Sequence, residues 1–392
     1  MKQYKVALFI GRFQPFHRGH LYSLKKCFEL ADHVLVGIGS SQESGTESNP
    51  WDWETRKKMI ETLDLQGLSL KVVAIPDLFN DEKWGAQIVK LLGEAGCEPS
   101  QVVAVGNNEW TNRILRERGI AVYESGLYKR NELEGKKIRK MMKRGDGKWK
   151  KRVPKAVLPS LRSEEIALWL RKIYRDKPAV IGVSGGVDSA VALTLLVRAL
   201  GKERVIPLCL PYKNQEMHDA KQIIEWNGLS NKLVEINLAE MVDGITGKLE
   251  VGREVVRKGN ILARVRMICL FDMAKRVGGM VCGTENKSER ELGYYTRFGD
   301  AASDVEPIAG FYKTEIWELA RDLGLPEVFV TKKPSAELWT GQSDEGEMGF
   351  GYLEADRVLR GETGGIEKKV IAQVRERVAK QKFKREVPYQ LT

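Results

Sequence analysis

Two glycine-bearing turns, each between a predicted strand and a predicted helix, constrain the fold of this chain more than any other feature. The first spans residues 11–20 and follows the apolar run 4–10. The second spans residues 184–189 and follows the apolar run 179–183. A turn of this kind brings a ligand to a helix N-terminus, where free N–H groups and the helix dipole favour anions. The two turns differ in chemistry, so we predict two different phosphate-binding domains.

Strand and helix patterns alternate along the rest of the chain, which favours parallel α/β sheets. We therefore predict two Rossmann-like parallel-sheet domains, comprising residues 1–158 and 159–392. The basic stretch 136–155, followed by Pro159, marks their boundary. The other predicted strands are 34–39, 71–75, 102–105, 121–123, 205–210 and 232–236, and the predicted helices are 21–31, 162–174, 190–200 and 220–227.

Charge and composition limit the classes of function. The chain has 392 residues, a net charge of +11 and a pI near 9.2. A basic balance predicts polyanionic partners, and both nucleic acid and phosphorylated small molecules such as ATP satisfy it. We expect no membrane segment, because no apolar run approaches the roughly 18–20 residues of a spanning helix. We expect no signal peptide, because the N-terminus has no long apolar region and no small-residue cleavage site. Five cysteines without metal or disulfide spacing predict free thiols in a reducing compartment, and hence a cytoplasmic protein.

The first turn combines a glycine at the strand end with a pair of histidines. Gly11 lets a substrate approach the backbone closely. His17 and His20 flank Gly19, so both imidazoles can reach one phosphate. Imidazole suits developing negative charge because it donates hydrogen bonds without a covalent step. The alternative is an ordinary strand–helix turn with surface histidines, but two of the 4 histidines in the chain lie here, so we predict catalytic roles for His17 and His20.

The run G-R-F-Q-P-F-H-R-G-H resembles the H-x-G-H signature of nucleotidyltransferases and, in its full form, the archaeal-type nicotinamide-mononucleotide adenylyltransferases. This resemblance implies transfer of AMP from ATP to a mononucleotide phosphate, with release of pyrophosphate. It also implies that Gly11, Arg12 and Phe13 bind nucleotide. In a later block that is similar to the family's pyridine-binding region, Trp84 would stack on a pyridine ring. A position in the hydrophobic core is the alternative for Trp84.

One segment departs from that family. Residues 134–139 read E-G-K-K-I-R where the family shows S-G-T-x-I-R. The resemblance implies that Arg139 is a phosphate ligand, with a solvated basic helix as the alternative. Glu134 and Lys136 replace the two hydroxyls, and a carboxylate at this place would repel a triphosphate. A second possibility therefore stays open, in which the N-terminal domain senses nucleotides without transferring AMP.

Glycines and hydroxyls in the second turn predict a pyrophosphate cradle, against which Asp188 could hold Mg²⁺. The sequence S-G-G-V-D-S lacks the G-K-[ST] of a Walker A loop. It resembles the S-G-G-x-D-S loop of ATP pyrophosphatases, which have an adenine nucleotide α-hydrolase-like fold and adenylylate a substrate before a nucleophile enters. That resemblance implies nucleotide binding by Ser184, Gly185, Gly186 and Ser189.

Blocks from residue 184 almost to the end resemble NAD synthetases, and the block 333–345 is similar to a mobile loop that closes over the substrate. This resemblance implies that Glu289 is a second Mg²⁺ carboxylate. It makes Asp300 and Lys313 catalytic, the first near the reacting carboxyl and ammonia and the second at an ATP phosphate. For Asp300 the alternative is a plain turn residue, and for Arg264 a solvated helix face. The implied nucleotide-binding residues are Arg264, Thr284, Arg297, Asp304, Lys313 and Ser335.

Together the resemblances imply a bifunctional enzyme of NAD biosynthesis. The first half would adenylylate nicotinic acid mononucleotide to deamido-NAD, and the second would amidate deamido-NAD to NAD through an acyl-adenylate. The implied requirements are two ATP, Mg²⁺ and free ammonia, because no glutaminase domain is recognised. NAD synthetases are usually dimeric, which implies a homodimer or a higher homo-oligomer.

Two alternatives concern the second half. A tRNA-modifying ATP pyrophosphatase would share the S-G-G-x-D-S loop and explain the basic charge, but the chain has no C-x-x-C pair. We therefore predict no nucleic-acid partner and no membrane partner. In the other alternative, the synthetase half amidates the mononucleotide first, which reverses the order of the two steps.

Overall fold

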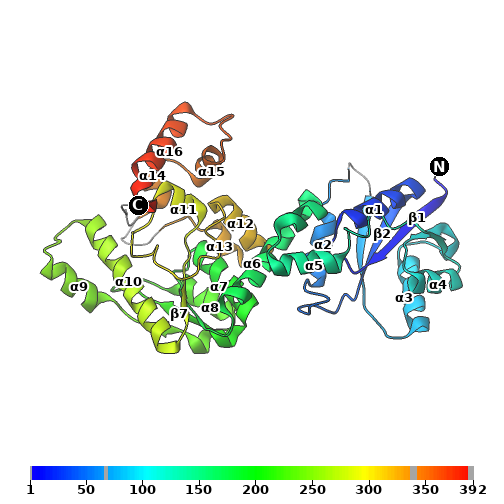
Figure 1. The fold of residues 1–392 in the computed structure, drawn as a ribbon, viewed down its shortest axis with the longest axis horizontal. Helices are drawn as coiled ribbons and strands as arrows, with labels where there is room; N and C mark the ends of the chain where they lie inside the picture. Colours follow the sequence, from blue (N-terminus) through cyan, green and yellow to red (C-terminus); the bar gives the residue numbers. More distant parts are fainter. Residues whose placement is uncertain (1, 66–68, 336–341, 387–392) are drawn as a thin grey trace. The chain divides into compact units, whose positions relative to one another are not determined.

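The computed structural model describes residues 2–65, 69–335 and 342–386, which fall into two compact units, Met1–Glu165 and Ile166–Thr392. Each unit contains its own parallel β-sheet (Figure 1). Helix α6, Leu158–Tyr174, spans the position of the predicted domain boundary. The boundary after residue 158 stays a prediction.

The N-terminal unit has a five-stranded sheet of order β3-β2-β1-β4-β5, and every pair of neighbours is parallel. Alternate residues of β1 and β2 face two buried layers, so these strands are apolar almost throughout. The strands are β1 Tyr4–Gly11, β2 Ala31–Gly39, β3 Ser69–Ile75, β4 Val102–Val105 and β5 Ala121–Tyr123.

Among the described residues, five α-helices accompany this sheet, and side-chain caps set several of their starts. Asp52, Asn80 and Asn108 each accept the backbone N–H three residues further on, at the starts of α2, α3 and α4. Helices α3 and α4 pack against each other beside the sheet (Figure 1). The helices are α1 Arg18–Leu30, α2 Trp53–Glu61, α3 Asp81–Glu94, α4 Glu109–Glu117 and α5 Gly135–Arg144, with 3₁₀ turns η1 Pro99–Gln101, η2 Gly147–Arg152 and η3 Lys155–Val157.

The C-terminal unit has a four-stranded parallel sheet of order β8-β7-β6-β9. Helix α7 is buried along most of its length, because it packs between this sheet and α12. The strands are β6 Ala179–Gly182, β7 Val205–Cys209, β8 Val234–Glu235 and β9 Met280–Cys282.

A separate apolar cluster joins α11, α15 and α16, and Figure 1 shows the last two side by side. Its largest buried side chains include Tyr352 and Phe350. The remaining elements are α7 Val187–Leu200, α8 His218–Trp226, α9 Ala239–Lys248, α10 Val255–Val277, α11 Lys287–Leu292, α12 Lys313–Asp322, α13 Glu327–Thr331, α14 Asp344–Met348, α15 Tyr352–Leu359 and α16 Lys368–Lys380, with η4 Lys202–Arg204, η5 Ser230–Lys232 and η6 Lys382–Arg385.

Both glycine-bearing turns lie where the strand order of a sheet reverses. Strand β1 has β2 on one side and β4 on the other, and β6 likewise lies between β7 and β9. At such a switch point the connections leave in opposite directions, which opens a crevice at the carboxyl ends of the strands. The turns that begin at Gly11 and Ser184 follow those two central strands directly.

The predicted fold class is confirmed, because all paired strands among the described residues are parallel and lie in two α/β units. One helix begins earlier than predicted: α1 starts at Arg18, so His20 lies inside its first turn. All five cysteines are free thiols. In the described ranges, no helix combines the length and apolarity that crossing a bilayer would require.

Candidate active sites

The turn after β1 is shaped by its own aromatic side chains. Phe13 is 1% exposed and has a positive φ of 51°. Its ring lies over Gly11, where an added β-carbon would come within 2.9 Å of it. The same ring meets Phe9, Phe16 and His20 at centroid distances of 4.9–5.6 Å. Glycine at position 11 therefore makes room for Phe13, whose implied contact with nucleotide stays a prediction.

His17 and His20 form a stacked pair, with ring centroids 3.6 Å apart. The Nδ1 atom of His17 accepts the backbone N–H of His20 at 3.3 Å, and the Nδ1 atom of His20 accepts that of His17 at 3.2 Å. Since both Nδ1 atoms are acceptors, this pattern assigns the ring proton of each neutral imidazole to Nε2. Two Nε2–H donors are thus available at the start of α1.

The same pair is held in its neutral form. Burial lowers the pKa of His17 to about 4, although the nearby Glu134 carboxylate opposes this shift. Burial, with a further contribution from His17, lowers the pKa of His20 well below its ordinary value. At neutral pH the pair therefore offers hydrogen-bond donors without positive charge.

Arg56 links the ends of β1 and β2 through hydrogen bonds to their backbone. It is 0% exposed, and its guanidinium donates to the carbonyls of Gly39 at 2.8 Å, Ser40 at 3.0 Å and Arg12 at 3.1 Å. All of these partners are backbone oxygens, so Arg56 is a structural residue in this arrangement. The Arg12 side chain is exposed, as its implied nucleotide contact would require.

Helix α5 approaches the same turn through Gly135. A β-carbon at Gly135 would lie 2.7 Å from the carbonyl oxygen of Gln14. Arg139 donates to this oxygen at 2.5 Å and to the carbonyl of Glu47 at 3.0 Å. Arg139 is therefore close to the turn but is already bonded to backbone, and its role at a phosphate stays a prediction. Glu134, directly before α5, pairs with Lys137 at 3.3 Å.

Trp84 lies in the hydrophobic core of the N-terminal unit. It is 4% exposed on α3, and its ring centroid is 5.0 Å from that of Trp110. The position matches the alternative given for Trp84, a place in the hydrophobic core. Stacking of Trp84 on a pyridine ring stays a prediction. Trp110 is the more accessible of the two rings, at 45% exposed.

The second site is a cavity of about 380 Å³ at the carboxyl end of the C-terminal sheet. Its size falls within the range of small-molecule sites, about 300–1,000 Å³. Asp188 and Glu289 line the cavity together with seven other predicted residues, which come from five separated segments of the chain. These seven are Ser184, Gly186, Ser189, Thr284, Asp300, Lys313 and Ser335.

The turn after β6 forms a polar cradle in this cavity. The hydroxyls of Ser184 and Ser189 are 3.2 Å apart, and the Ser184 hydroxyl accepts the N–H of Gly186 at 3.3 Å. Gly185 has a φ of 87°, and a β-carbon there would lie 2.8 Å from the backbone nitrogen of Ala220. Gly186 precedes α7 without a side-chain cap, so the first N–H groups of this helix can face a ligand.

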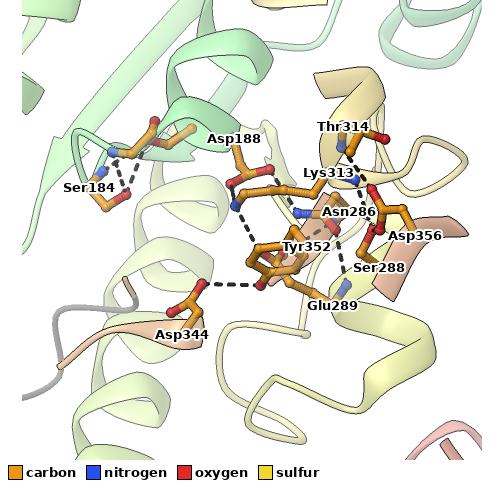
Figure 2. Close-up of polar contacts among 12 residues, drawn as sticks. Ser184, Asp188, Asn286, Ser288, Glu289, Lys313, Thr314, Asp344, Tyr352 and Asp356 are labelled. Atoms are coloured by element: carbon orange, nitrogen blue, oxygen red, sulfur yellow. Dashed lines mark hydrogen bonds and ion pairs between the residues drawn. The ribbon is translucent and has the colours of Figure 1, made fainter. Parts of the chain in front are cut away.

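Asp188 and Glu289 meet at a single ammonium group (Figure 2). The Nζ atom of Lys313 lies 2.5 Å from Oδ2 of Asp188 and 3.1 Å from Oε1 of Glu289. Asn286 joins the carboxylates, donating its side-chain amide to Asp188 at 2.9 Å and its backbone N–H to Glu289 at 3.3 Å. The sequence placed these residues in one site, and the structure brings them into direct contact. Asn286 was not among the predicted site residues.

The charges in this group are strongly coupled. Burial by itself would lower the pKa of Lys313, but Asp188 and Glu289 raise it above its ordinary value. Burial raises the pKa of Glu289; Asp188 and Asp344 add to the rise, and Lys313 opposes it. Asp188 and Glu289 thus contact one ammonium, and Asp344 acts on it electrostatically.

Asp356, which sequence reasoning missed, anchors the backbone beside this group. It is 0% exposed and accepts the hydroxyl of Ser288 at 2.5 Å and the N–H of Thr314 at 2.9 Å (Figure 2). Ser288 in turn accepts the backbone N–H of Lys313 at 2.8 Å. One buried carboxylate from α15 therefore fixes the starts of α11 and α12. No sequence pattern marks Asp356, because it acts only through contacts with distant segments.

The donor set fits a magnesium ion. Mg²⁺ is commonly held by one or two carboxylates together with phosphate oxygens and water. Asp188 and Glu289 direct oxygens at one position, which the ammonium of Lys313 takes in this structure. Across the part of the chain that the structure describes, no group of three or more His, Cys, Asp or Glu side chains is arranged for a metal. Further ligands would therefore come from substrate phosphates.

Four predicted residues do not line the cavity, and one of them is Gly185 of the turn itself. Arg264 is exposed on α10, and its neighbour Arg266 lines the cavity instead. Arg297 lies over the rings of Phe298 and Phe383. Asp304 accepts the backbone N–H of Val281 at 2.7 Å. Their nucleotide-binding roles stay predictions, and part of the predicted closing loop, residues 336–341, lies outside the described residues.

A second group of buried carboxylates lies near the cavity residues Gly283 and Asp300. Burial, together with the carboxylates of Glu306, Glu289 and Asp300, raises the pKa of Glu285 to about 8. Burial likewise raises the pKa of Glu306 to about 7. A β-carbon on the cavity residue Gly283 would lie 2.0 Å from Oε1 of Glu306, so glycine there makes room for this carboxylate.

Comparison with known proteins separates the two units. The NAD synthase family model matches residues 163–388, and the Cytidylyltransferase-like family model matches residues 8–140. The chain is 46% identical over 199 residues to an NH(3)-dependent NAD(+) synthetase of Methanosarcina acetivorans, covering 49% of this chain and 77% of that protein. It is 47% identical over 181 residues to the synthetase of the same name from Pyrococcus furiosus, covering 46% and 70%.

Two solved structures resemble the chain over 60% of its length. One is an NMN synthetase from Francisella tularensis, with a TM-score of 0.55, 32% identity and 98% of that chain covered. The other is an NH3-dependent NAD synthetase from Campylobacter jejuni, with a TM-score of 0.51, 30% identity and 99% covered. The family match includes both the Ser184–Ser189 turn and the Asp188–Glu289–Lys313 group. The chain belongs to the NAD synthase family.

Proposed function

We propose that this chain performs two consecutive steps of NAD biosynthesis. The N-terminal unit transfers AMP from ATP to nicotinic acid mononucleotide, and the C-terminal unit amidates the resulting deamido-NAD with ammonia and a second ATP. The observation that carries the proposal is that each sheet has a different glycine-bearing turn at its own switch point. One turn supplies paired neutral imidazoles, and the other a hydroxyl cradle beside two carboxylates and a lysine.

In the first step, an oxygen of the mononucleotide phosphate attacks the α-phosphorus of ATP, and pyrophosphate leaves. The Nε2–H groups of His17 and His20 donate hydrogen bonds to the phosphate oxygens on which charge develops. The pair needs no proton transfer, because its neutral form already carries the donors. The exposed Arg12 supplies positive charge at the mouth of the turn.

In the second step, the nicotinate carboxylate attacks the α-phosphorus of the second ATP and pyrophosphate leaves. Ammonia then attacks the carbonyl carbon of the acyl-adenylate, loses a proton and expels AMP. The Ser184–Ser189 turn binds the pyrophosphate portion through its hydroxyls and N–H groups. Bound Mg²⁺, held by Asp188 and Glu289, would neutralise charge on that pyrophosphate. Asp300 lines the cavity, and in this proposal it receives the proton that ammonia loses.

Product analysis tests both steps. We expect purified protein with ATP, Mg²⁺, ammonium and nicotinic acid mononucleotide to form NAD, and to stop at deamido-NAD when ammonium is omitted. Glutamine should not replace ammonium. The variant Asp188→Asn should accumulate deamido-NAD, whereas His17→Ala should use supplied deamido-NAD normally but form it from the mononucleotide much more slowly. Failure to form deamido-NAD refutes the first step, and failure to convert it refutes the second.

The order of steps has a second candidate. The likeness to the NMN synthetase of Francisella tularensis, at 32% identity, favours amidation of the mononucleotide before adenylylation. The rate of ammonium-dependent AMP release, measured with nicotinic acid mononucleotide and with deamido-NAD as the substrate, distinguishes the two orders. If nicotinic acid mononucleotide is amidated faster than deamido-NAD, the reversed order holds.

The negative charge of Glu134 bears on whether the N-terminal unit transfers AMP or only senses nucleotides. Its carboxylate lies near His17, and its influence on that imidazole is electrostatic. The double variant Glu134→Ser with Lys136→Thr restores the two hydroxyls of the transferase pattern. We expect it to lower the KM for ATP in adenylyl transfer. A wild-type chain that binds ATP but transfers no AMP would be a sensor. Salt-dependent binding of tRNA would instead favour the tRNA-modifying alternative.

We also propose a homodimer formed through the synthetase unit. Light scattering on the full chain measures its mass directly, and a monomeric mass at working concentration contradicts the proposal.

A further inference from the structure

The ammonium of Lys313 lies between the carboxylates of Asp188 and Glu289. The inference drawn from this position rests on the proposed synthetase function. The Lys313 side chain is 3% exposed, and those of Asp188 and Glu289 are 15% and 16% exposed. Its Nζ atom lies within hydrogen-bond distance of both carboxylates at once (Figure 2). The ammonium thus has the ligands that a shared Mg²⁺ would take.

We propose that Lys313 is an internal cation that keeps the magnesium position between Asp188 and Glu289 closed until a nucleotide polyphosphate draws its ammonium away. Lys313 is in this sense a positioning residue for the metal. It preserves the arrangement of the two carboxylates before the substrate arrives, and it makes metal binding depend on nucleotide binding.

The charges around the group explain why a cation is needed there at all times. Asp344 adds a third carboxylate, since it acts electrostatically on Lys313, Glu289 and Asp188. Its Oδ2 atom accepts the hydroxyl of Tyr352 at 3.1 Å. Without an ammonium or a metal, like charges would face one another at short range in a poorly solvated site.

The backbone and side chain of Lys313 are held by different contacts, so the ammonium can move alone. The backbone N–H is fixed to Ser288, which is fixed to Asp356. The long aliphatic stem ends with Nζ 5.2 Å from the ring centre of Tyr352. Four rotatable bonds separate the anchored backbone from Nζ, so the ammonium can turn toward a phosphate while α12 stays in place.

The ammonium of Lys313 competes with free Mg²⁺ for the two carboxylates, because it is tethered beside them. A covalently attached ammonium has a high effective concentration at the two carboxylates, which free Mg²⁺ must overcome. A bound polyphosphate offers the ammonium another anion and brings oxygens that complete the metal's ligands. Metal alone should therefore bind weakly to the wild-type chain.

Mn²⁺ binding to the full chain, measured by electron paramagnetic resonance without nucleotide, tests this inference. We expect Lys313→Met to bind Mn²⁺ about tenfold or more tightly than the wild type, because the tethered competitor is gone. Adding Glu289→Gln to Lys313→Met should abolish the gain. The matched control is Lys232→Met, which removes a lysine paired with Glu203 at 2.6 Å elsewhere in the same unit. It should leave Mn²⁺ affinity unchanged.

An unchanged or weaker Mn²⁺ affinity in Lys313→Met overturns the inference. If that variant also loses affinity for a non-hydrolysable ATP analogue, Lys313 is only a phosphate ligand, and the proposed synthetase function still stands. If Lys313→Met does not fold in metal-free buffer, its melting transition is followed by circular dichroism as Mg²⁺ is added. Recovery at millimolar Mg²⁺ supports the exchange of cations, and no recovery contradicts it.

Discussion

The Nδ1 atoms of His17 and His20 each accept the backbone N–H of the other residue, so the two imidazoles cap α1 reciprocally. The acceptor nitrogen of each ring is thus used in capping the helix, and the Nε2–H donor remains for a ligand. A local feature of the backbone thereby decides the tautomer of both side chains.

The first prediction concerns this pair. We expect His17→Ala and His20→Ala each to reduce kcat for adenylyl transfer by about 100-fold, because each removes one donor to the developing charge. Amidation of supplied deamido-NAD should be unchanged. His33→Ala, which alters an exposed histidine on β2, is the control. A loss below about threefold in both variants would show that the imidazoles do not act on the reacting phosphate.

The same pair predicts a pH dependence. The folded-state pKa of His17 is lowered to about 4 from 6.5, so the folded chain binds fewer protons than the unfolded chain between those values. The stabilisation from neutral His17 is therefore complete above about pH 6.5 and is lost as the pH falls toward 4. Histidine NMR should show Nε2–H tautomers for both rings at pH 7, and an Nδ1–H signal from either would contradict the assigned pattern.

The second prediction concerns Gly135 and the docking of α5. Gly135→Ala places a β-carbon about 2.7 Å from the Gln14 carbonyl, so α5 must shift, at a cost of about 1–3 kcal/mol in unfolding free energy. Adenylyl transfer should fall with it. Gly93→Ala, at a helical position with nothing within 4 Å of the added atom, should stabilise the chain slightly. Urea unfolding of both variants measures the difference, and equal effects would rule out the close approach.

The third prediction concerns Asp356. Asp356→Asn removes one of the two acceptors that fix Ser288 and the N–H of Thr314, and we expect a loss of about 1–3 kcal/mol. The KM for ATP in the amidation step should rise, because Lys313 is positioned through the same bonds. Asp176→Asn, at an exposed position, should change stability by less than about 0.5 kcal/mol. A variant with wild-type stability would show that this carboxylate does not anchor α12.

The fourth prediction concerns Glu285. Its folded-state pKa is raised to about 8 from 4.5, so the folded chain binds more protons than the unfolded chain between those values. Stability is therefore greatest at the acid end of this window and falls as the pH rises through about 8. Glu285→Gln cannot ionise, so its advantage over the wild type should grow by about 1–2 kcal/mol between pH 5 and pH 9.

Thermal melting across this range measures the effect. Glu376→Gln is the control, because Lys380 lowers the pKa of that exposed carboxylate and no such growth is expected. A gap between Glu285→Gln and the wild type that stays constant with pH would contradict the raised pKa.

The fold could be predicted because its signals are local. Apolar runs of strand length, each followed by a helical pattern, specify parallel βα units whatever lies elsewhere in the chain. The two glycine-bearing turns, and with them His17, His20, Ser184 and Asp188, lie within short segments whose neighbours set their geometry. The predicted strand 102–105 and the observed β4 coincide for this reason.

The candidate site could be predicted only in part, because side-chain direction depends on packing. Trp84 and Arg56 show this: both carry groups suited to ligands, yet the structure buries them, one in the core and one among backbone carbonyls. Arg264 is exposed while Arg266 lines the cavity, a difference that a helical pattern does not resolve without knowing which face is covered.

By itself, then, the sequence determined two α/β units, the turns that begin their sites and the types of residue gathered around each. Tertiary structure alone decided that Lys313 reaches Asp188, 125 residues away, and that Asp356 fixes the backbone beneath it. The reason is physical: local patterns set backbone conformation, whereas the meeting of side chains from distant segments is set by how sheets and helices pack.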